Sequence, residues 1–467
     1  MPERDVVEIL NNYSRNIDIF IKSVLNRVPA QKAVSCFNNE EIDSSVYAGL
    51  VQAAECLPVE ERMRVFGCAA PAATAEIKEL LEKKSLRCVA EMIGSGTPVE
   101  PLYRNGGGFV KDSAELSLPL RVNWCGTWSD TPPYCLENGG AVVNAAVSVD
   151  GTMPVNVRIQ RIDEPKAILE YSDSGERGEL GGCDTIESLA DPMEPLPLIK
   201  AALMVSGIIP MPGVRPEGNV FEKLGGGLSI SAGAPGIPKG SGLGTSSILL
   251  AACVKALLEF TGREIDGEEV CRRVLLAEQL MGTGGGWQDQ AGALTPGIKI
   301  ANSKKGFRQQ VKCERLNAPP AFIDELKERF CLVYSGKRRL GRTILREMMG
   351  GYIRSDPLYL KTLGEIHALA GQMKSSIEAG DMERFLANLN SQTRLTKKLD
   401  TGYSNEHLET ILSSCAALTD AAMICGAGGG GFMQIFLKKG FSREDLNGVL
   451  NKAFPGRDIG VRPCELL

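Results

Sequence analysis

The sequence has few of the residues from which metal centres and disulfide-stabilised domains are built. Only 2 of its 467 residues are histidines, and its 14 cysteines are scattered singly, without a Cys-x-x-Cys pair. Zinc ligands usually occur in closely spaced pairs and disulfide frameworks in small secreted domains, so both classes are excluded. We therefore expect a reduced, cytoplasmic protein.

Long hydrophobic runs and an excess of positive charge are also missing. No stretch approaches 18 uninterrupted apolar residues, and the N-terminal residues become amphipathic at once, so we expect neither a membrane span nor a signal peptide. The 52 Lys and Arg against 57 Asp and Glu give a net charge of −5, which argues against a nucleic-acid backbone binder. A small-molecule substrate is the expected partner.

The overall composition, with 43% apolar residues, 52 glycines and 25 prolines, is typical of a globular protein. Residues 1–113 are predicted to be helical, because apolar residues recur at spacings of three and four over residues 6–28 and 77–92. The second of these runs follows Thr74 and is expected to stop at Gly94. The glycine- and proline-rich residues 94–108 are the candidate linker.

From residue 114 onward the pattern predicts a mixed α+β protein in two lobes, at residues 114–328 and 329–467. Short alternating or apolar runs are typical of strands, whereas apolar runs of 14 or more residues are typical of buried helices. Strands are predicted at residues 116–122, 141–149, 155–162, 228–232, 331–334 and after 431, and helices at 246–260 and 268–281.

A glycine-rich segment at residues 238–247, which we call the glycine loop, lies between a predicted strand and a predicted apolar helix. Glycines allow close backbone approach to a ligand, and a helix start offers N–H groups and a positive dipole end to an anion. The alternative is a turn with a Ser or Thr N-cap. The predicted phosphate contacts are Lys239, Gly240, Ser241, Gly242, Leu243, Gly244, Thr245, Ser246 and Ser247.

A second glycine-rich segment, the glycine cluster at residues 426–431, formally matches the pattern G-x-G-x-x-G. The residues that follow, 432–437, predict a strand, whereas a dinucleotide-binding fingerprint must open a helix. A dinucleotide site is therefore excluded here. The cluster predicts close backbone approach, either to a neighbouring element or to a loop that holds a ligand. A Walker A loop is also missing, because the pair Gly336-Lys337 is followed by arginine.

Two carboxylates are candidate functional residues. Glu278 lies on the apolar face of a predicted helix, with no Lys or Arg three or four residues to either side, so its partner is a metal ion or a cation from elsewhere in the fold. A paired structural glutamate is the alternative. Asp289 follows residues 284–286, which are glycines, at the start of a predicted helix, where an N-cap or first-turn acid is also common.

Four cations complete the set of candidates. Arg121 ends an alternating strand beside Gly126 and, taken alone, fits an ordinary solvated arginine. Lys239, Lys337 and Arg338 are candidates for the phosphate side, and each also fits a surface charge.

Three segments, in this order, resemble the signature motifs of the GHMP small-molecule kinases: residues 121–130, the glycine loop and the glycine cluster. Within that family, further segments are similar to the kinase half of L-fucokinases, namely residues 128–135, 285–290 and 334–337. The resemblance covers residues 114–467 and does not include the nucleotidylyltransferase half that some fucokinases carry.

The resemblance implies a two-lobed GHMP kinase fold, with an S5-domain-2-like N-lobe, a ferredoxin-like C-lobe and an extra helical N-terminal region. It implies ATP-dependent phosphorylation of the anomeric hydroxyl of L-fucose, with Mg²⁺ as cofactor. By the same resemblance, Asp289 is the catalytic aspartate and Arg121 the cation that stabilises the reacting groups. Ser246 and Glu278 would bind Mg²⁺, and the sugar contacts would be Trp128, Ser129 and Asp130.

Related activities stay open at this point. Galactokinases carry Glu-His where this chain has Thr127-Trp128, and an aromatic wall suits the methyl group of a 6-deoxy sugar better than a hydroxyl. The alternatives are a kinase of heptose 7-phosphate or of D-arabinose, a diphosphate decarboxylase, and a non-catalytic protein that binds sugar and ATP. The intact set Arg121, Ser246, Glu278 and Asp289 argues against the non-catalytic protein.

Overall fold

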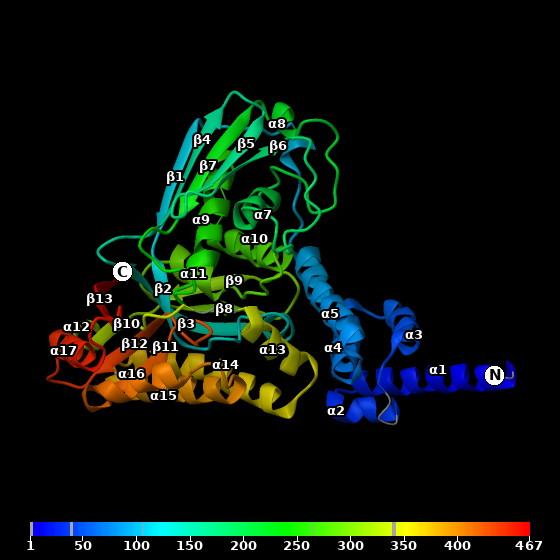
Figure 1. Cartoon of the computed structure of the whole chain (residues 1–467). Helices are drawn as coiled ribbons and strands as arrows, with labels where there is room; N and C mark the ends of the chain where they lie inside the picture. The colour runs from blue at the N-terminus through cyan, green and yellow to red at the C-terminus, as the bar shows by residue number, and fades with distance from the viewer. Residues whose placement is uncertain (1–2, 38–40, 105, 265, 339–341) are drawn as a thin grey trace. The chain divides into compact units, whose positions relative to one another are not determined.

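The computed structural model describes all residues except 1–2, 38–40, 105, 265 and 339–341 (Figure 1). The chain divides into two compact units, and each contains residues from two separate parts of the sequence. Unit 1 comprises residues 1–96 and 346–362, and unit 2 comprises residues 97–345 and 363–467. The predicted boundaries at residues 113 and 328 stay predictions, and the two units are described separately below.

Unit 1 is helical, as the spacing of its apolar residues predicts. The first run forms one helix of 23 residues, and the second begins directly after Thr74 and ends two residues beyond Gly94. Asp43 caps another helix by accepting hydrogen bonds from the backbone N–H groups of Ser45 and Val46. The helices are α1 (Glu3–Leu25), α2 (Ala30–Ala33), α3 (Ser44–Glu55), α4 (Val59–Ala69) and α5 (Ala75–Gly96).

The end of α13 (Arg342–Ile353) and the residues that follow it as far as residue 362, which include the start of α14 (Pro357–Glu378), complete unit 1. The buried guanidinium of Arg64 on α4 donates to the carbonyl oxygens of Tyr352 (3.5 Å) and Ile353 (3.1 Å). Its central carbon also lies 5.3 Å from the centroid of the Tyr352 ring. A Cβ atom on Gly67 would lie 2.4 Å from the Ile353 side chain, so glycine is needed there. Residues far apart in sequence thus form one core.

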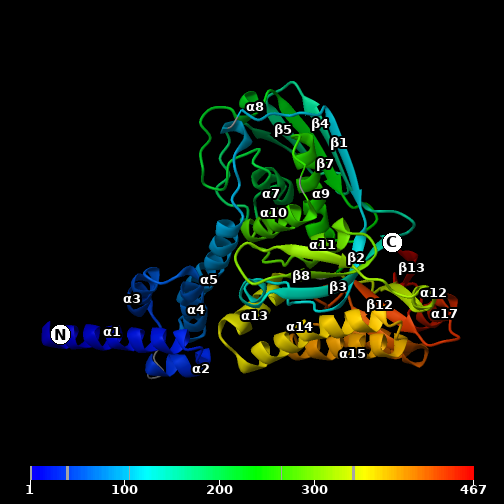
Figure 2. The ribbon, with the colours of Figure 1, turned by 180° about the vertical axis from the view of Figure 1, so that it is seen from behind.

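The first sheet of unit 2 has the strand order β1-β4-β7-β5-β6. Its neighbouring strands are antiparallel except β5 and β7, which are parallel. Helix α9 packs on β1, β4 and β7 of this sheet, and α7 and α10 pack on α9 (Figures 1 and 2). The strands are β1 (Ser113–Leu118), β4 (Val155–Ile162), β5 (Lys166–Tyr171), β6 (Arg177–Gly181) and β7 (Gly227–Gly233), and the helices are α7 (Pro197–Val205), α8 (Val220–Lys223), α9 (Thr245–Phe260) and α10 (Gly267–Leu280).

The second sheet is built on β3, all of whose residues are buried. Along its length β3 pairs antiparallel with β2, β8 and β14, and β8 pairs with β9. The short helix α11 packs on β2 and β3. The elements are β2 (Leu120–Cys125), β3 (Gly140–Val149), β8 (Ile298–Ser303), β9 (Val311–Arg315), β14 (Cys464–Leu466), α6 (Tyr134–Asn138) and α11 (Gln288–Leu294).

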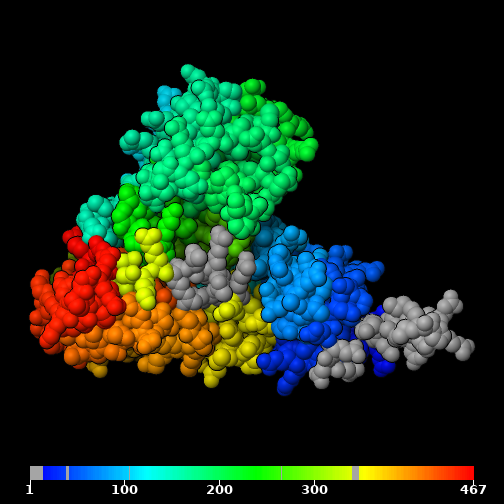
Figure 3. Space-filling model, viewed as in Figure 1, coloured from blue at the N-terminus to red at the C-terminus, as the bar shows by residue number. Residues whose placement is uncertain are grey.

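The third sheet is antiparallel, with the order β11-β12-β10-β13. Helices α14 and α15 run side by side in both ribbon views, and the C-terminal residues form one continuous surface, orange to red in Figure 3. The elements are β10 (Phe330–Tyr334), β11 (Thr419–Ile424), β12 (Phe432–Leu437), β13 (Gly460–Arg462), α12 (Pro320–Arg329), α14 (Pro357–Glu378), α15 (Met382–Leu399), α16 (Glu406–Cys415) and α17 (Arg443–Ala453).

The predicted strand at residues 116–122 is wrong as a single element, because β1 ends at Leu118 and β2 begins at Leu120, in another sheet, after Pro119. Arg121, expected at the end of a strand, is therefore the second residue of β2. The other predicted strands and helices are found, with ends displaced by only a few residues. Among the helices that the structure describes, none combines the length and the hydropathy needed to cross a membrane.

Candidate functional site

The glycine loop connects β7 to the N-terminus of α9, a helix of 16 residues. Gly244 occupies the N-cap position with φ +76°, a left-handed conformation that favours glycine. The hydroxyls of Ser241 and Thr245 lie 3.0 Å apart and are hydrogen-bonded across the start of the helix. The loop therefore has the backbone geometry that suits an anion at a helix N-terminus.

The glycine cluster packs directly on the glycine loop. The backbone N–H of Phe432 donates to the carbonyl oxygen of Ser241 at 2.8 Å. A Cβ atom on Gly431 would lie 2.4 Å from that same carbonyl oxygen, and one on Gly426 would lie 2.8 Å from Cα of Gly242. The cluster thus approaches the glycine loop, and it also approaches the backbone of Tyr403 and Lys337, so the close approach predicted from its glycines is confirmed, whereas ligand binding by the loop stays a prediction.

Arg121 and Asp289 form a charged pair next to the glycine loop. Nη2 and Nε of Arg121 lie 2.5 and 2.7 Å from Oδ1 of Asp289, and Nη1 donates to the carbonyl oxygen of Gly242 at 2.8 Å. Arg121 is 3% exposed, whereas the side chain of Asp289 is 20% exposed. Arg121 is thus not a solvated surface residue, and it joins the loop to a carboxylate 168 residues away in sequence.

Asp289 lies in the first turn of α11 and faces the glycine loop. A Cβ atom on Gly244 would lie 2.9 Å from Cγ of Asp289, so any side chain at position 244 would collide with the carboxylate. The structure therefore brings together Arg121, Asp289 and the helix N-terminus of α9, three features that the sequence places far apart.

Glu278 is the second carboxylate beside the loop, near the end of α10, and it is 3% exposed. Its Oε1 accepts a hydrogen bond from the hydroxyl of Ser247 at 2.6 Å, and its Oε2 accepts one from the hydroxyl of Thr283. Ser246, the predicted metal-binding hydroxyl, is exposed at the start of α9. At the start of α9 the hydroxyl that contacts Glu278 is that of Ser247, the residue after Ser246. The metal-binding role of Ser246 stays a prediction.

The predicted sugar-binding residues follow β2 and are buried. Ser129 is fully buried, and its hydroxyl is hydrogen-bonded to the backbone of Gly126 and Ala141. Such a hydroxyl stabilises its own turn, so its predicted role as a sugar contact has the least support from the geometry. Trp128 is 4% exposed and has a positive φ of 88°.

Asp130 is fully buried, and its carboxylate accepts hydrogen bonds from the backbone N–H groups of Trp128 (3.2 Å) and Gln288 (3.1 Å). The pKa of Asp130 is raised from 3.8 to about 7, mainly by burial and to a smaller extent by the nearby charge of Asp289. The backbone hydrogen bond from Gln288 acts in the opposite direction. The group is thus poised to change its protonation state near neutral pH.

The predicted phosphate-side cations lie at the edge of this region. The ammonium group of Lys239 lies 5.7 Å from the centroid of the Tyr171 ring. Lys337 and Arg338 are exposed, and the carbonyl oxygen of Lys337 accepts a hydrogen bond from the N–H of Gly431. Lys337 is thereby connected through the glycine cluster to the glycine loop.

Three polar residues of the candidate site, Thr283, Gln288 and Asn123, are not among those predicted from the sequence. Thr283 lies just past the end of α10, five residues after Glu278. This short spacing is the sequence signal from which the contact between the two side chains could be predicted. Among the described residues there is no group of three or more His, Cys, Asp or Glu side chains placed to hold a metal ion. Any metal here therefore needs hydroxyl or ligand oxygens in addition.

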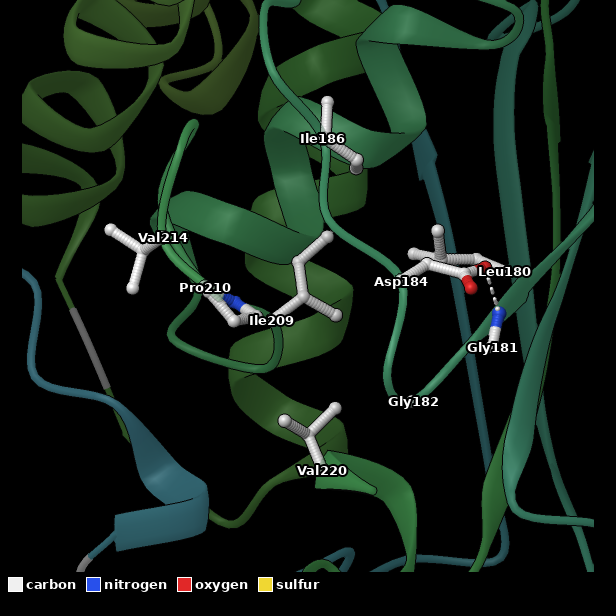
Figure 4. A pocket seen from close by; sticks show the side chains of 9 residues that line it. All are labelled: Leu180, Gly181, Gly182, Asp184, Ile186, Ile209, Pro210, Val214 and Val220. Carbon is white, nitrogen blue, oxygen red and sulfur yellow. Dashed lines mark hydrogen bonds between the residues drawn. The ribbon is translucent and has the colours of Figure 1, made fainter. Parts of the chain in front are cut away.

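A separate small pocket lies between the end of β6, the loop after it and the start of α8 (Figure 4). Its lining is largely apolar, and within it the N–H of Gly181 donates to the Asp184 carboxylate at 2.6 Å. None of the predicted site residues lines it; the lining residues are Leu180, Gly181, Gly182, Asp184, Ile186, Ile209, Pro210, Val214 and Val220.

Comparison with protein families identifies two domain models in this chain. The model of the GHMP kinases N terminal domain matches residues 217–297, which contain the glycine loop, Glu278 and Asp289. The model of the GHMP kinases C terminal domain matches residues 373–455, which contain the glycine cluster. The two matches thus cover the parts of unit 2 that meet around the charged pair.

Curated relatives support the same assignment. The bifunctional fucokinase/GDP-fucose pyrophosphorylase of Arabidopsis thaliana is 34% identical over 338 residues, which are 72% of this chain and 31% of that protein. The L-fucokinase/L-fucose-1-P guanylyltransferase of Bacteroides fragilis is 32% identical over 340 residues, or 72% and 36%. The chain therefore spans about a third of the length of these two relatives.

A shorter relative and a solved structure extend the comparison. The D-glycero-alpha-D-manno-heptose 7-phosphate kinase of Campylobacter jejuni is 26% identical over 323 residues, which are 68% of this chain and 88% of that protein. The crystal structure of Methanococcus jannaschii mevalonate kinase matches 76% of this chain and 98% of its own, with a TM-score of 0.54 and 18% identity. This likeness confirms the two-lobed fold.

Proposed function

Since the chain belongs to the GHMP kinase family, we propose that it is an ATP-dependent kinase that phosphorylates the anomeric hydroxyl of L-fucose to L-fucose 1-phosphate. The observation that carries the proposal is the pair Arg121–Asp289 at the N-terminus of α9. Phosphoryl transfer depends mainly on positioning and on charge stabilisation, and this arrangement supplies both.

In the proposed reaction the sugar hydroxyl lies beside Asp289, which accepts its proton as the new oxygen–phosphorus bond forms. The bond between the γ-phosphorus and the bridging oxygen breaks, and ADP leaves with that oxygen. The guanidinium of Arg121 carries a fixed positive charge and stabilises the negative charge on the reacting oxygens. The N–H groups of the glycine loop bind the phosphates.

The residues around Glu278 fit a Mg²⁺ ion. A buried carboxylate that is bonded to the hydroxyls of Ser247 and Thr283 offers the hard oxygen ligands that this ion prefers, and one or two protein ligands suffice when phosphates supply the rest. Glu278 with Ser246 or Ser247 would hold the ion. When bound, Mg²⁺ would neutralise negative charge on the phosphates of ATP.

L-fucose is the proposed substrate because the names of two relatives above 30% identity include fucokinase. Trp128, in the predicted sugar-binding segment, supplies an aromatic wall for a methyl group where galactokinases have a polar residue. The free state of all fourteen cysteines supports a reducing, cytoplasmic environment for this reaction.

Heptose 7-phosphate is the second candidate substrate, favoured by the Campylobacter jejuni relative, which the chain covers over most of its length. A phosphorylated sugar needs an additional cationic contact, and the exposed Lys337 and Arg338 offer one. D-arabinose, a pentose of similar stereochemistry to L-fucose, is the corresponding free-sugar alternative.

A coupled assay of ADP release over a panel of acceptors tests the proposal. The panel contains L-fucose, D-arabinose, D-galactose, heptose 7-phosphate and mevalonate diphosphate. We expect the highest kcat/KM with L-fucose and about 100-fold or less discrimination against D-arabinose, which lacks only the methyl group. Faster turnover of heptose 7-phosphate or D-galactose would change the proposed substrate but leave the proposed kinase activity in place. If none of the acceptors leads to ADP release, both proposals are contradicted.

A further inference from the structure

Gln288, the residue before Asp289, is held at both ends of its backbone and through its side chain. Its N–H donates to Oδ2 of Asp130 at 3.1 Å, and its carbonyl oxygen accepts from Nδ2 of Asn144 at 3.2 Å. Its side-chain Oε1 accepts a hydrogen bond from Nδ2 of Asn123. A residue that is fixed at three points leaves its neighbour, Asp289, little freedom of position.

The groups that hold Gln288 are buried on adjoining elements. Asn123 and Asn144 are 3% and 0% exposed, and they are direct partners in the antiparallel ladder of β2 and β3. Arg121 lies two residues before Asn123, so both side chains project from the same face of β2. The strand that supplies the arginine of the charged pair thus also supplies the amide that holds the helix of the aspartate.

Helix α11 lies close against this face of the sheet. A Cβ atom on Gly292 would lie 2.9 Å from Cβ of Arg121 and 3.0 Å from Nδ2 of Asn144, so glycine is needed for the close approach. The helix has only seven residues. So short a helix has little rigidity of its own, and side-chain contacts to the sheet have to fix its direction.

The amide contacts also continue beyond α11 to the strand that follows the glycine cluster. The carbonyl oxygen of Asn123 accepts from Nε2 of Gln434 at 2.9 Å, and Oε1 of Gln434 accepts from Nε1 of Trp124 at 3.1 Å. Gln434 is fully buried on β12. One chain of amide contacts therefore connects β12, β2 and α11.

We propose that Asn123 and Gln288 are positioning residues that fix the carboxylate of Asp289 against Arg121 and the glycine loop. The proposal rests on the proposed kinase function and adds to it how the base is held. Neutral amides suit this task, because they form hydrogen bonds next to the two carboxylates Asp130 and Asp289 without adding a third charge. Displacement of a reacting group by about 1 Å lowers a rate by up to about 100-fold.

The test uses the single variants Asn123→Leu and Gln288→Met and their double variant. The matched control is Gln309→Met, because Gln309 is also a buried glutamine, and its side chain donates to the carbonyl oxygens of Cys135, Lys304 and Gly306. Turnover, KM for ATP, thermal midpoint and amide hydrogen exchange of residues 288–294 are measured on each protein.

We expect each single variant to lower kcat by about 10-fold or more with KM for ATP changed by less than about 2-fold. The double variant is expected to lose no more than the worse single variant, because the two side chains act as one contact. Exchange of residues 288–294 should accelerate by about 10-fold in the variants. Gln309→Met should lower the thermal midpoint but leave kcat unchanged.

Wild-type kcat in Gln288→Met, or losses that multiply in the double variant, would overturn the positioning role. The same follows if Gln309→Met lowers kcat equally, because the effect then reflects stability alone. If the wild-type protein turns over no acceptor, the kinase proposal fails, and the exchange measurement still decides whether the amide pair holds α11.

Discussion

The two glycine-rich segments of unit 2 differ in what their glycines face. In the glycine loop, Gly244 faces the carboxylate of Asp289, at the start of α9. In the glycine cluster, Gly428, Gly430 and Gly431 face backbone carbonyl oxygens of other segments, at 2.3, 3.1 and 2.4 Å from their ideal Cβ positions. Gly244 of the glycine loop thus lies against the predicted catalytic carboxylate, whereas Gly242 of the loop, like these glycines of the cluster, lies against a backbone carbonyl oxygen, that of Cys425 at 2.4 Å.

The element after each segment explains the difference. The glycine loop opens a helix, and only a helix start combines N–H groups with a positive dipole end. The glycine cluster opens the strand β12, whose first N–H group is used by the carbonyl oxygen of Ser241. A glycine pattern by itself therefore does not predict an anion site. That prediction also requires that a helix begins directly after the glycines.

The largest effect is expected at the residue that the glycine loop faces. Asp289→Asn should lower kcat by at least about 100-fold while the affinity for ATP changes little, because the proton acceptor is lost and the phosphate contacts are kept. Single-turnover kinetics and calorimetric titration with ATP check the two quantities. Near-wild-type turnover would remove Asp289 from the reaction and leave the two segments functionally alike.

The glycine cluster should instead affect stability. Gly431→Ala combines a positive φ of 79° with a close approach to the carbonyl oxygen of Ser241, and should lower the free energy of unfolding by roughly 3 kcal/mol. The control is Gly440→Ala, with φ +90° and no atom within 4 Å of its Cβ position, for which about 1 kcal/mol is expected. Equal losses in urea unfolding would mean that the contact adds nothing.

The third prediction asks which hydroxyl at the start of α9 serves the metal. Glu278→Gln should raise the Mg²⁺ concentration for half-maximal activity by about 10-fold, since a charged oxygen ligand is lost. Comparing Ser246→Ala with Ser247→Ala then identifies the second ligand. Glu268→Gln, at the other end of α10, is the control. Mg²⁺ titrations that superimpose for all variants would make Glu278 a structural residue.

The last prediction concerns the pH dependence of stability. The folded pKa of Asp130 is about 7 against 3.8 ordinarily, so the folded protein keeps a proton that the unfolded chain loses between about pH 4 and pH 7. The contribution of this group to stability therefore falls as the pH rises through that window. In Asp130→Asn the free energy of unfolding, measured with urea from pH 4 to pH 8, should fall less steeply with pH than in the wild type. An unchanged slope would show that Asp130 is ionised throughout this range.

The sequence predicted much of the fold, because long apolar runs and alternating strands are dictated locally. The predicted helix at residues 246–260 is α9 with one residue missing at its start, and the strand at 155–162 is β4 itself. Strands β5 and β6 were missed, since they are half exposed and rich in charge and glycine. Their pairing with other strands, and not their composition, makes them strands.

The site was predicted in its charged residues but not in its amides. Glu278 and Asp289 are candidates from their local patterns alone, an apolar helix face and a position after three glycines, and the resemblance to known motifs supplies their predicted roles and that of Arg121. Asn123 and Asn144 are polar residues within strands, and nothing local indicates that they point inward to a residue 144 or more positions away. The contribution of residues 346–362 to unit 1 was equally invisible, because it depends on contacts across nearly 300 residues.

The discontinuity of unit 1 has a consequence during synthesis on the ribosome. The carbonyl groups that receive Arg64 belong to residues translated 288 and 289 positions later. At roughly 5–20 residues per second, the first helices wait on the order of 15–60 seconds for the end of α13. Over that time the guanidinium of Arg64 and the backbone at Gly67, against which Ile353 later packs, lack their final partners. Residues 1–96 thus complete their core only after most of unit 2 has been made.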